Sequence, residues 1–330
     1  MLQVPPGVAA RALGLECRQW ASSTRPLFFG VTLTPASLGG LRDTTGLRAA
    51  ELRQMQLDRY AGSVLDLSGV ELGREASLTA VAAREWMMPT WSRACPLCLK
   101  RDGVWPLWWR LGIAAVCPVH RCLLVDVCPR CGVRLLRGSE RGPRGLLTRE
   151  PLPAAGECAN RPSHGPKGRA GLCRQVLADI PTTTAPEAWA DLQRRVLAVA
   201  EGAPARIQGE PVSGADWFAA LRYLTALTRL AATGEDVADL PGFVAEAFVE
   251  DQRRRTGWPR GGGGTRLTAM PASAAQALAA LALTDQVLSS SRTGTAGPLA
   301  SWIQRATAQR RTVGGADPLR HLPRPAVVAA

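Results

Sequence analysis

Between residues 95 and 173, seven of the eight cysteines and one of the two histidines have the spacing of zinc ligands. The first set opens with Cys95-Pro-Leu-Cys98, and after 18 further residues the chain reads Cys117-Pro-Val-His120. Two ligands separated by two residues can both face one metal at the tip of a tight knuckle, and two facing knuckles supply the four soft donors of a closed structural zinc site. The sequence therefore predicts a first structural Zn²⁺ bound by Cys95, Cys98, Cys117 and His120.

A third knuckle begins a second ligand set. It reads Cys128-Pro-Arg-Cys131 and is followed by two isolated cysteines, Cys158 and Cys173, which are separated by 14 residues. Because these two cysteines do not form a knuckle, His164 between them can replace either one as the fourth ligand. The sequence predicts a second structural Zn²⁺, and so two per chain, with Cys128, Cys131, Cys158 and Cys173 as its ligands.

Other cysteine chemistries agree less well with this pattern. Disulfides need an oxidising compartment, and the first thirty or so residues do not resemble a signal peptide. Covalent haem attachment requires histidine directly after Cys-x-x-Cys, where Leu99 and Gly132 stand. A zinc deaminase needs His-x-Glu, which the sequence lacks. We expect the two remaining cysteines, Cys17 and Cys122, to be buried thiols rather than ligands.

The ligands are not accompanied by a recognisable catalytic constellation. A catalytic zinc keeps one coordination position open and needs a nearby general base, whereas the first set has four good ligands. Of the three histidines, His164 and His321 lie in loop-like sequence, and the glycines at 261–264 lack the Gly-Lys-Ser/Thr ending of a phosphate loop. We therefore expect a protein that is not an enzyme; the alternative, a hydrolytic second zinc centre, would require an open coordination position.

The composition indicates a mainly helical, basic protein. Ala, Leu and Arg dominate the 330 residues, aromatic residues make up 5%, and strand-like alternation is scarce. No apolar stretch approaches the roughly 18 residues of a membrane-spanning helix. The formal net charge is +13, which favours a nucleic-acid partner, because arginine presents a planar fork to phosphate oxygens.

The arginines occur in clusters. Residues 130–174 contain ten Lys or Arg against three acids, and a second cluster lies at 253–260 around Trp258. For any single arginine a solvated surface position is the simpler interpretation, whereas the clustering as a whole favours DNA contact. The predicted DNA-contacting residues are Arg134, Arg137, Arg141, Arg144, Arg253, Arg254, Arg255 and Arg260.

We expect three regions along the chain. Residues 1–91 form a helical N-terminal region, with apolar residues at helical spacing between Leu47 and Tyr60. Residues 92–180 contain two zinc fingers, in which metal binding supplies folding energy of about 10 kcal/mol per site in place of a large core. Three tryptophans lie between the halves of the first site: Trp105, Trp108 and Trp109. We expect them to fill the space between the knuckles, and the alternative is that they stack on nucleic-acid bases.

Residues 181–330 are predicted to form further helices. Thr184, Pro186 and Glu187 are a helix-start signature, and the following apolar stripe stops before Gly202. Further helices are expected to start near Ser213, to span Pro241 to Arg255, and to run from Ser273 to about Leu288. Short helices with basic ends are compatible with helix-turn-helix units, although no turn signature identifies one.

The order of these motifs resembles the TniQ family of TniQ/TnsD-like transposition target-selection adaptors. Residues 95–132 carry Cys-Pro-x-Cys-Leu, a Trp-rich interval, Cys-Pro-x-His and Cys-Pro-x-Cys-Gly almost without interruption. The flanks are similar more loosely, at Ala9–Leu15, at Thr45–Tyr60 and around Leu172-Cys173. The resemblance covers roughly residues 9–200.

The resemblance implies a non-catalytic adaptor in a bacterial, cytoplasmic and nucleoid-associated setting. Such an adaptor links target DNA, or a CRISPR effector complex, to an AAA+ transposition ATPase of the TniB/TnsC type. The resemblance also implies N-terminal helices, zinc fingers and helix-turn-helix-like modules. It implies no membrane partner, and a homodimer is possible. The family usually opens with a Pro-rich segment and a Gly-Glu-Ser motif, which this sequence lacks, so the resemblance implies either a misassigned start codon or a member with a shortened N-terminal region. The alternative is a free-standing zinc-containing DNA-binding transcriptional regulator, which shares the zinc ligands and the basic charge.

Overall fold

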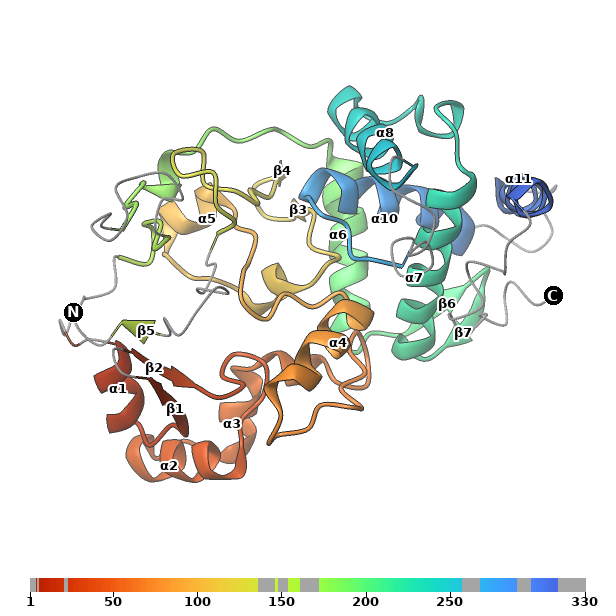
Figure 1. Cartoon of the computed structure of the whole chain (residues 1–330). Helices are drawn as coiled ribbons and strands as arrows, with labels where there is room; N and C mark the ends of the chain where they lie inside the picture. The colour runs from red at the N-terminus through yellow and green to blue at the C-terminus, as the bar shows by residue number, and fades with distance from the viewer. Residues whose placement is uncertain are drawn as a thin grey trace.

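The computed structural model describes residues 4, 6–20, 23–135, 146–147, 154–160, 172–256, 268–289 and 298–313. Within these residues the chain is mainly helical, as the composition predicts, and its strands are few and short. Figure 1 shows the N-terminal elements and the last helices on opposite sides of the molecule, with the cysteine-rich region and helix α6 between them.

The N-terminal region combines short helices with a small sheet. Its helices are α1 (Pro6–Ala12), α2 (Pro35–Thr45), α3 (Ala49–Gln54), the 3-10 helix η1 (Leu57–Tyr60) and α4 (Glu75–Glu85). Strand β1 (Cys17–Trp20) pairs antiparallel with β2 (Ser23–Pro26), which also pairs with β5 (Leu146–Leu147). Helix α2 begins where the Thr34 hydroxyl accepts a hydrogen bond from the Ser37 amide at 3.2 Å, which satisfies one of the free N–H groups of the first turn.

In the described part of the cysteine-rich region the elements are all short. These are helix α5 (Pro96–Arg101), the 3-10 helices η2 (Leu107–Arg110) and η3 (Leu177–Asp179), and the paired strands β3 (Val116–Cys117) and β4 (Cys122–Leu123). Their buried side chains form a separate apolar cluster that includes most of the predicted ligands together with Trp109, Leu124 and Leu135.

The C-terminal helices follow the predicted boundaries closely. They are α6 (Glu187–Ala200), α7 (Gly214–Ala231), α8 (Gly242–Thr256), α10 (Ala274–Leu288) and α11 (Pro298–Val313), and a hairpin of β6 (Ala205–Ile207) and β7 (Glu210–Val212) joins α6 to α7. The hydroxyls of Ser213 and Ser273 cap α7 and α10, as their positions predict. Helix α11 is not among the predicted helices, and a helix-turn-helix unit stays a prediction.

One hydrophobic core unites the first and last regions. From the N-terminal region it contains Phe28, Leu57 and Tyr60. The cysteine-rich region contributes several residues between Leu111 and Val116, and the C-terminal helices contribute their inner faces. The carboxylate of Glu85, 3% exposed, lies 3.2 Å from the Arg222 guanidinium on α7. The sequence composition changes near residues 91 and 180, but the regions on either side share one core. The division into three domains at these positions stays a prediction.

The helices that the structure describes include none that is both long and apolar enough to cross a lipid bilayer.

Candidate metal centres

Helix α5 and the β3–β4 pair position the first ligand set. Cys95 precedes α5 with extended backbone, and Pro96 occupies the first helical position, where its fixed φ is already suited to a helix. Cys98 therefore lies on the first turn of α5, next to Cys95. On the other side, Arg121 has a φ of 49° and its amide donates to the Cys117 carbonyl at 2.8 Å, which closes the second knuckle.

The four ligand atoms of this set converge. Their Sγ and Nδ1 atoms lie within 4.8 Å of one another, and Nδ1 of His120 is 3.2 Å from the Cys98 sulfur and 3.5 Å from the Cys95 sulfur. The sulfurs of Cys98 and Cys117 are 3.6 Å apart. A tetrahedral zinc with bonds of about 2.3 Å to sulfur separates its ligands by about 3.8 Å. The set can therefore hold a zinc ion with little movement.

Burial and mutual contact disfavour the thiolate forms of the first ligand set. Burial, together with the neighbouring Cys117 thiol, raises the pKa of Cys98 to about 11. The pKa of Cys117 is raised further, by its contact with Cys95 and by burial. Three adjacent thiolates are unstable without a counter charge, and a divalent metal supplies it and deprotonates them.

The second ligand set is assembled by pairing between distant segments. Gly132, with a φ of 65°, donates its amide to the Cys128 carbonyl at 2.9 Å and so closes the third knuckle. Cys158 and Cys173 lie on two antiparallel segments, where the Cys173 amide donates to the Asn160 carbonyl and the Arg174 amide to the Cys158 carbonyl. This pairing brings the two isolated cysteines together.

All four sulfurs of the second set lie within 4.8 Å of one another. Cys128 is 3.8 Å from Cys173, and Cys131 is 3.8 Å from Cys158, which again matches the edge of a zinc tetrahedron. Burial acts to raise the pKa of Cys128, yet backbone N–H groups of the knuckle lower it overall, which favours the thiolate. His164 lies outside the described residues. Both clusters can thus hold metal ions, and their donors are those that zinc prefers.

The remaining cysteines differ from each other. Cys122 is buried, as expected, and its sulfur lies 3.6 Å from that of Cys95, next to the first centre. Cys17 is only half-buried, contrary to expectation, because it lies on strand β1 with its thiol donating to the Leu15 carbonyl.

The three tryptophans pack the first centre. Trp109 is fully buried, and the rings of Trp105 and Trp108 meet it edge to face at centroid distances of 5.7 and 6.1 Å. The indole N–H of Trp105 donates to the Ala155 carbonyl beside the second centre at 2.8 Å. Trp109 thus belongs to the apolar cluster of the ligand cysteines, and Trp105 and Trp108 pack against that cluster, which supports the predicted space-filling role.

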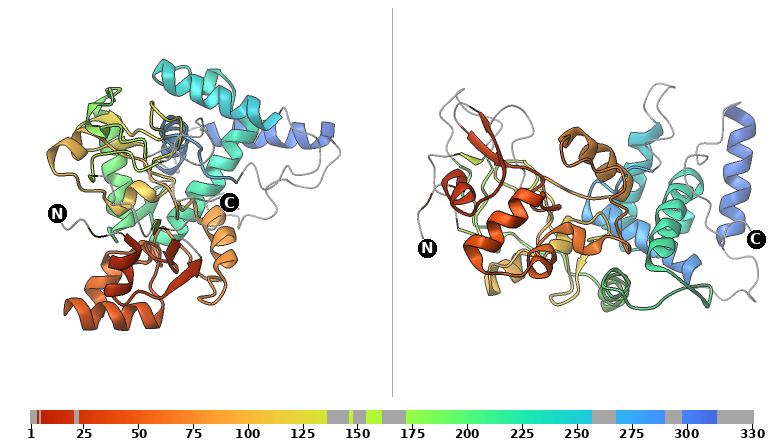
Figure 2. Two further views of the ribbon diagram at one scale, coloured as in Figure 1. Left: turned by 60° about the vertical axis from the view of Figure 1, so that its left-hand side comes forward. Right: turned by 90° about the horizontal axis from the view of Figure 1, so that it is seen from below.

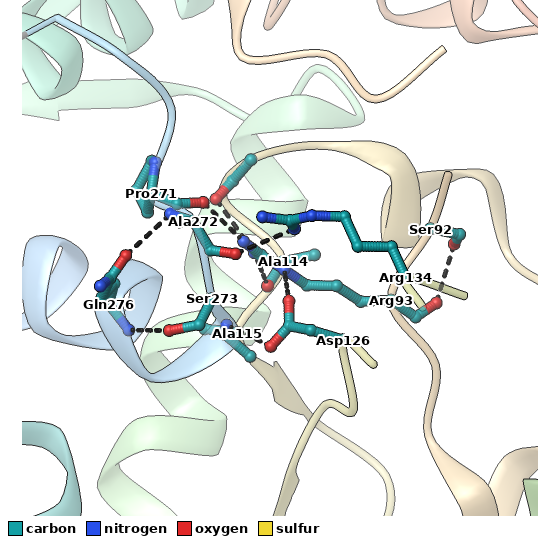
Figure 3. A network of polar contacts seen from close by, with 12 residues as sticks. Ser92, Arg93, Ala114, Ala115, Asp126, Arg134, Pro271, Ala272, Ser273 and Gln276 are labelled. Atoms are coloured by element: carbon teal, nitrogen blue, oxygen red, sulfur yellow. Dashed lines mark hydrogen bonds and ion pairs between the residues drawn. The ribbon is translucent and has the colours of Figure 1, made fainter. Parts of the chain in front are cut away.

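A fully buried arginine, which the sequence reasoning missed, links the segments that lead into the two centres. Arg93 precedes Cys95 by two residues, and its Nε donates to Oδ1 of Asp126, two residues before Cys128, at 2.7 Å. The same guanidinium donates to the carbonyls of Gly112, Ala114 and Pro271 (Figure 3). The other oxygen of Asp126 accepts the Ala274 amide at the start of α10 at 2.8 Å. The only sequence signal is the placement of both charges two residues before a knuckle.

The arginines predicted to contact DNA fall into three groups. Arg134 is engaged within the protein, because its Nη1 donates to the Ala272 carbonyl at 3.0 Å and its guanidinium lies 4.0 Å from the centroid of the Trp91 ring. Arg253 and Arg254 are exposed near the end of α8, where Arg254 pairs with Glu250 at 2.7 Å. Arg255 belongs to α8, but its side chain lies outside the described part of the structure. So do the other four candidates: Arg137, Arg141, Arg144 and Arg260.

Metal analysis of the purified chain should find two zinc ions per molecule. Cys158→Ser should lose one of them, because a donor of the second tetrahedron is removed, whereas His164→Ala should keep both. One zinc or none in the unsubstituted protein, or loss of zinc from His164→Ala alone, would contradict this ligand set.

Cys117→Ser should lose the first zinc and lower the melting temperature. The neighbouring Val116 belongs to the main core, so the loss of a site worth about 10 kcal/mol in binding should spread beyond the knuckles. Calorimetry with parallel metal analysis checks this, and a variant with an unchanged melting profile and two zinc ions would refute the first site.

Asp126→Asn should reduce the free energy of unfolding by about 3–5 kcal/mol, because it leaves the buried Arg93 charge without its counter-ion. Glu250→Gln is the matched control; it breaks the exposed pair with Arg254 and should cost at most about 0.5 kcal/mol. Denaturant unfolding of both variants measures the difference, and equal effects would show that the Arg93–Asp126 pair contributes no more than a surface pair.

Comparison with known protein families finds a match to the N-terminal part of the chain. The TniQ family model matches residues 1–124, a stretch that contains all four ligands of the first centre and ends before Cys128. Neither the curated proteins nor the solved structures contain a match to the chain. The family match agrees with the resemblance seen in the knuckle motif and supports the assignment of the chain to the TniQ family.

Proposed function

We propose that the chain is a non-catalytic adaptor in DNA transposition, which links recognition of target DNA to an AAA+ transposition ATPase. The TniQ match over residues 1–124 carries this proposal, because that family suggests a transposition-associated adaptor role. That the partners are an AAA+ ATPase and target DNA is the more specific part of the proposal. A CRISPR effector complex as the source of target recognition, and a homodimer as the active form, are extensions of it.

The shape of the protein agrees with an adaptor. Helices α1 to α3 and helices α8 and α11 lie on opposite sides of the molecule in both views of Figure 2. The hydrophobic core joins the two sides, so two partners could bind at the same time without competing for one surface. A common core also keeps the two surfaces at a fixed distance.

The metal centres support a structural rather than a catalytic role. Each cluster offers four protein donors, and a zinc with four protein ligands has no open position for a water nucleophile. The centres would instead fix the short elements around them, where little regular structure is present.

The C-terminal helices supply the proposed DNA contact. Arg253 and Arg254 are exposed on the last turns of α8, and the sequence that follows is rich in arginine and glycine. Such a segment can follow a phosphate backbone without reading bases. The free-standing transcriptional regulator remains the second candidate, supported by the same zinc ligands and charge but not by the family match.

Binding of the purified full-length chain to a purified AAA+ transposition ATPase of the TniB/TnsC type, in the presence of ATP, tests the adaptor role. We expect a stable complex on size exclusion. The full chain is needed because residues on both sides of Pro181 share one core, so a truncation there would expose apolar surface. DNA binding without ATPase binding would reject the adaptor and favour the regulator.

Replacing Arg253, Arg254 and Arg255 together with alanine should weaken DNA binding and leave both zinc ions in place. The slope of log affinity against log salt should fall by about 0.9 for each phosphate contact that is lost. A triple variant with the same change of charge serves as the control; it replaces the exposed Arg42, Arg48 and Arg74 of the N-terminal region. Equal loss of affinity in both would mean that net charge, and not the end of α8, binds DNA.

A further inference from the structure

A fifth donor lies beside the four ligands of the first centre. Cys122 is 2% exposed, and its sulfur is 3.6 Å from that of Cys95. The same distance separates the sulfurs of Cys98 and Cys117, two of the predicted ligands. Among the described residues, the Cys95 sulfur is the one polar contact of the Cys122 thiol. Cys122 therefore stands to the centre as a ligand does, and not as a thiol that merely packs in a core.

The pairing of β3 with β4 explains why the Cys122 side chain faces the centre. Cys117 and Cys122 lie directly opposite each other in the antiparallel register. The side chains of opposite residues lie on the same face of a strand pair, with Cβ atoms about 4.5–5.5 Å apart. Because Cys117 is a predicted ligand, its partner in the register is directed to the same place. The hairpin, and not the spacing of a knuckle, thus supplies the fifth donor.

The backbone on the other side of β4 is held as well. The Arg121 carbonyl accepts the Ala185 amide at 2.8 Å, and the Leu123 amide donates to the Thr183 carbonyl at 2.9 Å. These bonds hold both neighbours of Cys122 in place. Any approach of its thiol to the metal is thus a change of rotamer rather than a movement of the strand.

His120 is the least enclosed ligand of the first centre. Its three cysteine partners are buried, whereas His120 is half-buried, in the turn between β3 and β4. The sulfur of Cys122 is not among the four donor atoms that all lie within 4.8 Å of one another. Cys122 and His120 can therefore occupy the fourth coordination position in turn, but not together.

We propose that Cys122 is a reserve ligand of the first centre, which takes the fourth position when His120 leaves it. The donors of that second state are the sulfurs of Cys95, Cys98, Cys117 and Cys122, and four thiolates are one of the usual donor sets of closed zinc sites. A centre with a fifth donor keeps its metal while one ligand is exchanged. The inference concerns the metal centre alone and does not depend on the adaptor function.

Cys122 cannot replace Cys117 in the same way. The Cys117 sulfur accepts the His120 amide at 3.4 Å, and the Cys117 backbone pairs with Cys122. Removing the Cys117 thiol therefore takes away one ligand and also weakens the support of the other two donors of the hairpin. For this reason Cys117→Ser is expected to lose the first zinc, whereas His120→Ala is not.

Metal analysis of the full-length chain tests the reserve ligand. His120→Ala should keep two zinc ions per chain, because four thiols remain at the first centre, and His120→Ala combined with Cys122→Ala should keep one. The matched control combines His120→Ala with Cys17→Ala, which removes a thiol that packs against the N-terminal apolar cluster, and it should keep two. One zinc in His120→Ala, or equal zinc contents in the two double variants, would overturn the proposal.

X-ray absorption at the zinc edge of His120→Ala distinguishes Cys122 from a water molecule as the fourth ligand. We expect eight sulfur neighbours, four at each of the two ions. Seven sulfur neighbours and one oxygen neighbour would show that water fills the place of His120, and Cys122 would then be a packing residue only.

The chain loaded with cadmium provides a test that leaves all four predicted ligands in place. Cadmium is softer than zinc, so a fourth thiolate should displace the imidazole. Absorption at the cadmium edge should show eight sulfur neighbours for two ions in the unsubstituted chain, and seven sulfur neighbours with one nitrogen neighbour in Cys122→Ala. Equal counts in the two proteins would mean that Cys122 does not reach the metal, which contradicts the proposal.

Discussion

The buried pair of Arg93 and Asp126 holds together three parts of the chain that are distant in sequence. The segment that contains Arg93 exchanges backbone hydrogen bonds with Trp109, Val125 and Leu135, while its guanidinium reaches the Pro271 carbonyl before α10. Asp126 completes the connection by accepting the Ala274 amide. Both knuckle stretches and the C-terminal helices are therefore positioned around one ion pair, which is stable in a buried place only because every one of these partners is present.

Metal binding at the two clusters and apolar packing would have separate tasks in this protein. The described parts of residues 92–180 contain only short elements, and closed metal centres can fix such elements. The apolar core instead joins the N-terminal region to the C-terminal helices. A protein built in this way keeps two outer surfaces in a constant relation, which is the physical requirement for an adaptor that contacts two partners.

The sequence predicts the features that depend on local spacing. The three knuckles are recognisable because each ligand pair lies within one turn of the chain, and the capped starts of α7 and α10 are recognisable because serine precedes an apolar stripe. The second half of the second centre depends on pairing between Glu157 and Val176 across a long insertion, which spacing does not reveal. Arg93 was missed for the same reason, since its acceptors lie between 19 and 178 residues away. Nor does the sequence reveal that Arg134 is engaged within the protein, because its Trp91 and Ala272 partners come from separate segments.

The central claim is that both metal centres are closed, with protein donors alone. X-ray absorption at the zinc edge of the zinc-loaded full chain measures this directly, because it counts the atoms bound to the metal. We expect seven sulfur neighbours and one nitrogen neighbour shared between two ions, with zinc–sulfur distances of about 2.3 Å. An oxygen neighbour at either ion, or a fifth ligand, would reveal an open coordination position and contradict the structural role on which the account rests.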